Sequence, residues 1–76
     1  MLANYSDALR KRAKRIEKIG LMGMDALHIA CAEQAGAAFF ITCDDILVKK
    51  CENSREALNV KVIPLLRFIA EEVFKL

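Results

Sequence analysis

The sequence has few of the residues that break or cross-link a chain. It contains one proline and three glycines among 76 residues, and 55% of its residues are hydrophobic. These proportions exclude a disordered segment, a collagen-like repeat and a chain of several domains. A chain this short buries only about 60% of the surface that it exposes when unfolded. It therefore commonly needs a disulfide, a metal or a partner subunit for stability.

Cysteines are few, and their spacing fits no common cross-link. Cys31, Cys43 and Cys51 are an odd number and form no C-x-x-C pair, which argues against a secreted disulfide framework and a four-thiolate zinc site. No apolar run approaches the ~20 residues of a membrane-spanning helix, and the N-terminal segment lacks the apolar core of a signal peptide. We expect a cytoplasmic protein with no membrane association, stabilised by a partner subunit.

Positive charge is concentrated near the N-terminus, although the net charge is only +2. Residues 1–20 contain six basic and two acidic residues (+4), whereas residues 21–76 contain six basic and eight acidic residues (−2). Basic side chains on a helix are most often a solvated surface, and the functional alternative is a strip that contacts RNA phosphates. The candidate nucleic-acid-binding residues are Arg10, Lys11, Lys14, Arg15 and Lys18.

Helical periodicity predicts two helices before the first strand. In the first helix, apolar residues recur with i, i+4, i+7 spacing up to Gly20, and Ser6 and Asp7 offer N-cap side chains. The second helix spans about residues 22–35 and contains small residues suited to close packing, with Gly36 at the C-cap position. We expect this second helix to be largely buried.

The second half of the chain alternates strands and helices. Residues 37–42 (AAFFIT) form an apolar run without alternation, which predicts a strand buried on both faces. Asp44 follows as the N-cap of a helix over 45–51, residues 60–63 form a second strand, and a helix over 65–76 closes the chain. A strand–helix–strand unit joins two parallel strands. The fold class is therefore α/β, with a short parallel sheet (strands near 37–42 and 60–63) flanked by helices.

Two parallel strands leave an apolar edge that a monomer does not normally expose to water. The edge therefore implies that this unit pairs with another chain or has lost part of its own domain. If it pairs, we expect a homodimer that forms through the exposed strand edge.

Three segments carry a resemblance to a known family. Residues 24–30 (MDALHIA), 36–45 (GAAFFITCDD) and 60–64 (VKVIP) are similar to the C-terminal half of a PIN-domain ribonuclease. Many PIN domains are the toxins of prokaryotic toxin–antitoxin pairs. The similarity runs from the first helix to the last, so it implies that residues 1–76 form a single partial PIN-like domain with three layers.

The resemblance also implies a reaction and a set of residues. PIN domains bind Mg²⁺ or Mn²⁺ through acidic side chains at the carboxyl ends of parallel strands and hydrolyse RNA. Carried over, Asp25 and Asp44 match catalytic, metal-binding acids, Asp45 is an auxiliary metal ligand, and Thr42 positions the end of the strand. Such a cation prefers carboxylate oxygens, and it can both activate a water and neutralise phosphate charge.

The chain departs from the family at its N-terminal side. PIN domains begin with a strand that carries a first essential Asp, followed by helices that carry a Glu, and the resemblance places these elements before residue 1. The chain would then be a ribonuclease module that is incomplete by itself, and whether it acts as an Mg²⁺- or Mn²⁺-dependent endoribonuclease stays open. Its partners would be RNA, an antitoxin or the missing N-terminal half. The alternative is a catalytically inactive PIN remnant that serves as a homodimeric or protein-interaction module.

Asp25, Asp44 and His28 also have ordinary structural explanations. Asp44 could be only a helix N-cap, worth roughly 1 kcal/mol. Asp25 could be only an acid at a helix start, where the helix dipole favours it. His28, one turn after Asp25, could support that carboxylate, although a partly buried, satisfied histidine is the commoner situation.

Overall fold

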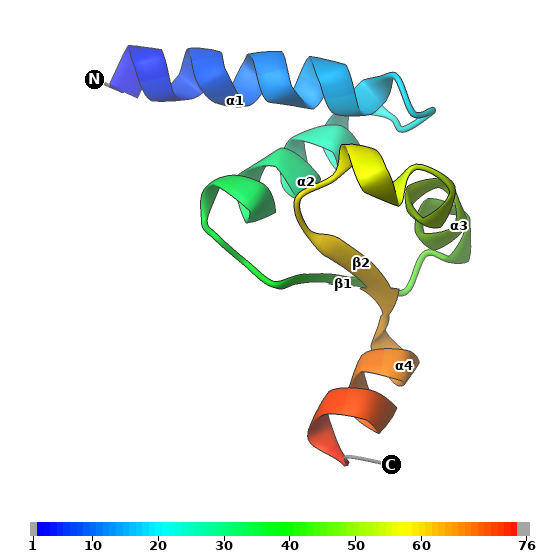
Figure 1. The fold of residues 1–76 in the computed structure, drawn as a ribbon. Coiled ribbons are helices and arrows are strands. Elements are labelled where there is room, and N and C mark those ends of the chain that lie inside the picture. Colours follow the sequence, from blue (N-terminus) through cyan, green and yellow to red (C-terminus); the bar gives the residue numbers. More distant parts are fainter. Residues whose placement is uncertain (1, 75–76) are drawn as a thin grey trace.

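The computed structural model describes residues 2–74, with side chains from residue 7 onward (Figure 1). The chain is a small α/β domain. Its elements are α1 (Leu2–Glu17), α2 (Gly23–Gln34), β1 (Phe39–Thr42), α3 (Asp45–Asn53), the 3₁₀ turn η1 (Arg55–Ala57), β2 (Lys61–Pro64), α4 (Leu65–Phe68) and the π-helical turn η2 (Ile69–Val73).

The two strands form a parallel sheet, as the sequence predicted. Phe39 lies opposite Lys61 and Thr42 lies opposite Pro64, with α3 and η1 in the crossover between the strands. β1 begins at Phe39 rather than at residue 37 because the chain must first leave the turn at Gly36, where φ is +74°. Glycine adopts this left-handed conformation without a steric penalty.

The first helix begins earlier than the capping residues suggested. α1 starts at Leu2, so the prediction that Ser6 or Asp7 caps its N-terminus is wrong. Asp7 lies inside the helix, where its Oδ1 is 3.8 Å from Nη2 of Arg10, three positions further along. Intrahelical hydrogen bonds continue through this region, so neither residue is needed as a cap.

Only one side of α2 is buried. α1 crosses that side (Figure 1), and the core cluster includes Ala26, Ile29 and Ala30 of α2. The prediction of a largely buried helix is wrong, because Met24 and His28 on the opposite side are exposed. The small residues of α2 therefore serve the contact with α1 rather than burial all round.

Helices lie on both sides of the sheet. Phe40 packs against the core cluster, whereas Phe39 meets Phe68 of α4 edge to face, with ring centroids 5.6 Å apart. In Figure 1, α4 lies on the far side of the sheet from α1 and α2. β1 is nevertheless not buried on both faces as predicted, and Ile41 is 39% exposed. Among the described residues the sheet has two strands, so each strand has one edge without a neighbouring strand.

The closing helix is shorter and less regular than predicted. α4 ends at Phe68, and η2 continues it with wider turns, in which the Phe74 amide donates to the Ile69 carbonyl at 3.0 Å. Residues 75 and 76, also assigned to this helix from the sequence, lie outside the described residues. No helix within residues 2–74 has both the length and the apolar character that a membrane crossing requires.

Candidate functional site

Asp25 and Asp44 line one cleft, which opens beyond the carboxyl end of β1. The cleft has a volume of about 220 Å³. Asp25 comes from the first turn of α2, and Asp44 follows β1 directly. The remaining lining residues are Leu21, Met22, Ile46, Leu47 and Lys50. The structure thus places both candidate carboxylates, Asp25 and Asp44, in the lining of one cleft.

Asp44 is held in a defined orientation. Its Oδ1 accepts hydrogen bonds from the backbone amides of Ile46 (3.0 Å) and Leu47 (3.1 Å), which makes it the N-cap of α3. Its own amide donates to Oγ1 of Thr42 at 3.1 Å. Oδ2 accepts no hydrogen bond from the described residues. The capping role predicted for Asp44 is confirmed, and it leaves one carboxylate oxygen for another partner.

Asp25 lies half-buried at the start of α2, close to α3. The N-cap position, Met22, offers no capping side chain, so Asp25 supplies negative charge at the positive end of this helix. Burial raises the pKa of the Cys51 thiol in α3, and the negative charge of Asp25 raises it further. The Asp25 carboxylate is therefore close enough to α3 to affect Cys51 electrostatically.

Lys50 adds a positive charge to the cleft that no sequence motif indicated. Its Nζ donates to the Gly20 carbonyl at 2.9 Å, although the two residues are 30 positions apart. Gly20 has a φ of +99° in the turn between α1 and α2. No local sequence signal could have found this contact, because it depends on how that turn packs against α3.

Of the other predicted site residues, Thr42 contacts Asp44, whereas Asp45 and His28 lie outside the cleft lining. Thr42 supports the end of the strand, because its hydroxyl accepts a hydrogen bond from the Asp44 amide. Asp45 is exposed and does not line the cleft. His28 is exposed rather than partly buried, and it forms no ion pair with Asp25 in the described part of the chain.

The cleft fits a divalent cation only in part. Its two carboxylates provide the oxygen ligands that Mg²⁺ prefers, and Lys50 reduces the formal charge of the lining to −1. Within residues 2–74, no group of three or more His, Cys, Asp or Glu side chains is placed to hold a metal ion. The described donor set is therefore smaller than a tightly bound metal requires.

Four basic residues of α1 and Lys18, in the turn that follows it, form one exposed face. We call Arg10, Lys11, Lys14, Arg15 and Lys18 the basic face, and all five are exposed. At 100° per residue, the spacing of the four members within α1 places them opposite Ala13 and Ile16, which are buried. Asp7 and three members of this face border a shallow depression of about 200 Å³. The geometry is compatible with a solvated helix surface and with a polyanion contact.

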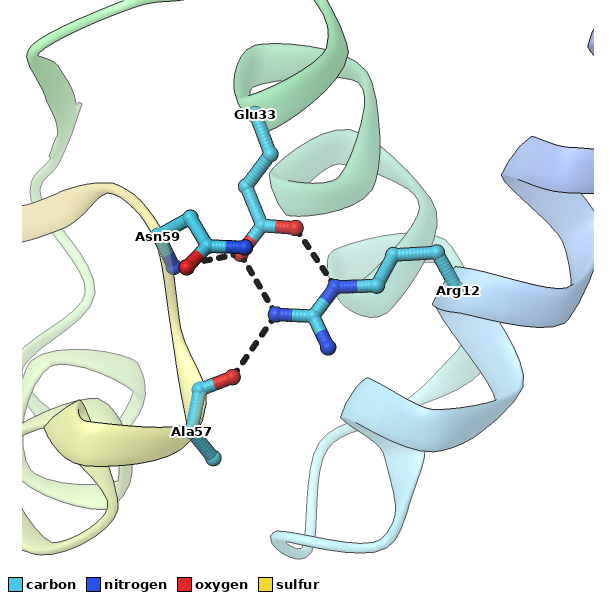
Figure 2. Close-up of polar contacts among 4 residues, drawn as sticks. All are labelled: Arg12, Glu33, Ala57 and Asn59. Atoms are coloured by element: carbon cyan, nitrogen blue, oxygen red, sulfur yellow. Dashed lines mark hydrogen bonds and ion pairs between the residues drawn. The ribbon is translucent and has the colours of Figure 1, made fainter.

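Arg12 behaves differently from its basic neighbours. Its Nε and Nη2 donate to the two oxygens of Glu33 at 2.6 and 2.9 Å, and Nη2 also donates to the Ala57 carbonyl at 2.7 Å (Figure 2). The Asn59 amide donates to Glu33 Oε2 at 2.7 Å. We call this group of four residues the Arg12–Glu33 clamp. It joins α1, α2 and the segment before β2.

The clamp shifts the titration of both charged groups. Burial alone would raise the pKa of Glu33, whose side chain is 7% exposed, but hydrogen bonds from Arg12 and Asn59 and the Arg12 charge leave it below its ordinary value. The hydrogen bond to Glu33 raises the pKa of Arg12. These mutually satisfied charges have a structural role.

Comparison with known proteins leaves the family open: no family model matches the sequence, and neither a curated protein nor a solved structure is significantly similar to it.

Proposed function

We propose that this chain is a PIN-like ribonuclease module of the toxin–antitoxin type, and that Asp25 and Asp44 belong to its divalent-metal site. One observation carries the proposal: both acids named by the motif resemblance line a single cleft beyond the carboxyl end of a parallel strand. Open α/β sheets bind their ligands in this location. Sequence motifs and spatial arrangement therefore agree on the same two side chains.

The proposed ion is Mg²⁺ or Mn²⁺. When bound, it would activate a water and neutralise charge on a phosphodiester. Asp44 would present Oδ2, because Oδ1 is occupied by the amides at the start of α3. Asp25 would provide the second carboxylate. Since two carboxylates fill few of the ~6 positions around Mg²⁺, waters and further oxygen ligands would fill the others.

The other residues of the chain would position the site and its substrate. Thr42 fixes the backbone at Asp44, and the start of α3 favours a negative charge there. The basic face of α1 would contact RNA phosphates. With these two carboxylates alone, the chain would bind the ion weakly and cleave RNA slowly.

Calorimetric titration with Mn²⁺ tests this proposal. The chain should bind one ion in a saturable manner, and Asp44→Asn should abolish the binding. Asparagine caps a helix about as well as aspartate, so this substitution removes the charge while preserving α3. Asp45→Asn is the matched control, because Asp45 is the adjacent acid but lies outside the cleft. Equal binding by the wild type and Asp44→Asn would contradict the proposal.

A second candidate function is an inactive PIN remnant that acts as a homodimeric or protein-interaction module. One edge of β1 has no neighbouring strand among the described residues, and this edge and the exposed apolar residues Met24, Leu27 and Ile41 favour it. Light scattering on the calorimetry sample distinguishes the two candidates. A folded dimer without any Mn²⁺ response would support the remnant, whereas a monomer that binds Mn²⁺ would support the metal site.

A further inference from the structure

Lys50 lies in the cleft with the two carboxylates and retains donors for a ligand. It is the only basic residue that lines this cleft among the residues that the structure describes. Its bond to the Gly20 carbonyl, 2.9 Å long, holds the ammonium group at the border of the cleft. An ammonium group has three N–H donors, so this bond leaves two for another acceptor.

The net negative charge of the cleft would repel a phosphate, and a bound cation would reverse this charge. Asp25 and Asp44 together carry −2, which repels a phosphodiester from the place where a metal would act on it. Lys50 brings the lining to −1, and a divalent cation would bring it to +1. A phosphate group would then meet a net positive site that still contains a directed N–H donor.

We propose that Lys50 binds a backbone phosphate of single-stranded RNA beside the Asp25–Asp44 pair. This inference rests on the proposed function and adds to it the residue that holds the substrate. Lys50 would raise RNA affinity and, because like charges repel, lower metal affinity. The two effects have opposite signs, which no general loss of structure would produce.

The test compares Lys50→Met with Lys49→Met. Lys49 is the neighbouring exposed lysine of α3 and lies outside the cleft, so both variants lose the same formal charge. Mn²⁺ affinity is measured by calorimetry, and affinity for a labelled single-stranded oligoribonucleotide by fluorescence anisotropy at several salt concentrations. Lys50→Arg restores a donor and a charge, and thermal melting checks that each variant is folded.

Lys50→Met should bind Mn²⁺ about fivefold more tightly, because the substitution removes a positive charge that repels the divalent ion. It should bind the oligonucleotide about fivefold more weakly, with the slope of log affinity against log salt reduced by about 0.7. Lys49→Met should change both quantities much less, and Lys50→Arg should restore RNA affinity. Equal effects of the Lys50 and Lys49 substitutions would overturn the role of Lys50, whereas a wild-type chain that ignores Mn²⁺ would overturn the proposed function.

Discussion

The Arg12–Glu33 clamp and the Asp25–Asp44 cleft place similar charged groups in opposite situations. In the clamp, the nearly buried Glu33 carboxylate accepts hydrogen bonds from an arginine side chain and from a backbone amide. In the cleft, Asp44 accepts hydrogen bonds only from backbone amides. Neither aspartate forms an ion pair within the described part of the chain. Charges that are satisfied within the fold stabilise it, whereas charges left without a counterion are available to a ligand.

The comparison predicts its largest effect at Arg12. Replacing Arg12 by alanine leaves Glu33 almost buried with only the Asn59 amide as partner. Leaving one member of such a pair unsatisfied costs about 2–4 kcal/mol. Urea unfolding should show this loss, and the midpoint of thermal unfolding should fall by about 4–8 °C for each kcal/mol. Arg10→Ala is the control, because its contact with Asp7 is exposed and 3.8 Å long; equal losses would refute a special role for the clamp.

Acidification should open the same clamp, with a smaller effect. The pKa of Glu33 is lower in the folded chain than its ordinary value of 4.5, so its ionised form stabilises the fold above that value. This contribution disappears as pH falls through the folded pKa. Between about pH 6 and about pH 3, the difference in unfolding free energy between the wild type and Glu33→Gln should therefore shrink. A constant difference would show that Glu33 does not titrate as its contacts imply.

In the cleft, stability and ligand binding should separate. Asp44→Ala removes the cap of α3 and should cost about 1 kcal/mol of unfolding free energy, whereas Asp44→Asn should change it by only a few tenths. Chemical denaturation of both variants measures this. If Asp44→Asn is as unstable as Asp44→Ala, the charge itself stabilises the fold, and the contrast between clamp and cleft fails.

Local sequence signals predicted much of the framework. Gly36 marked the end of α2, the apolar run before Asp44 marked β1, and Asp44 marked the start of α3. Each signal depends on the conformational preference of one residue or on short-range periodicity, which the chain carries wherever it folds. The resemblance to PIN domains, and not these local signals, made Asp25 and Asp44 candidate site residues.

The contacts that join distant segments could not be predicted in this way. Arg12 looked like any other base of α1, and its partner lies 21 positions away. The predicted burial of α2 and β1 was also too high. An apolar sequence shows that a segment can be buried, but the extent of burial depends on which other elements of the described chain pack against it.

The sequence by itself determined the order of helices and strands, the parallel direction of the sheet and the cap of α3, because these depend on local preferences and on the rules of strand connection. Tertiary structure decided which charges meet. It paired Arg12 with Glu33, placed Lys50 against Gly20 and brought Asp25 and Asp44 into one cleft. Those outcomes follow from the packing of α1, α2 and α3 on one another, and side-chain type alone does not encode them.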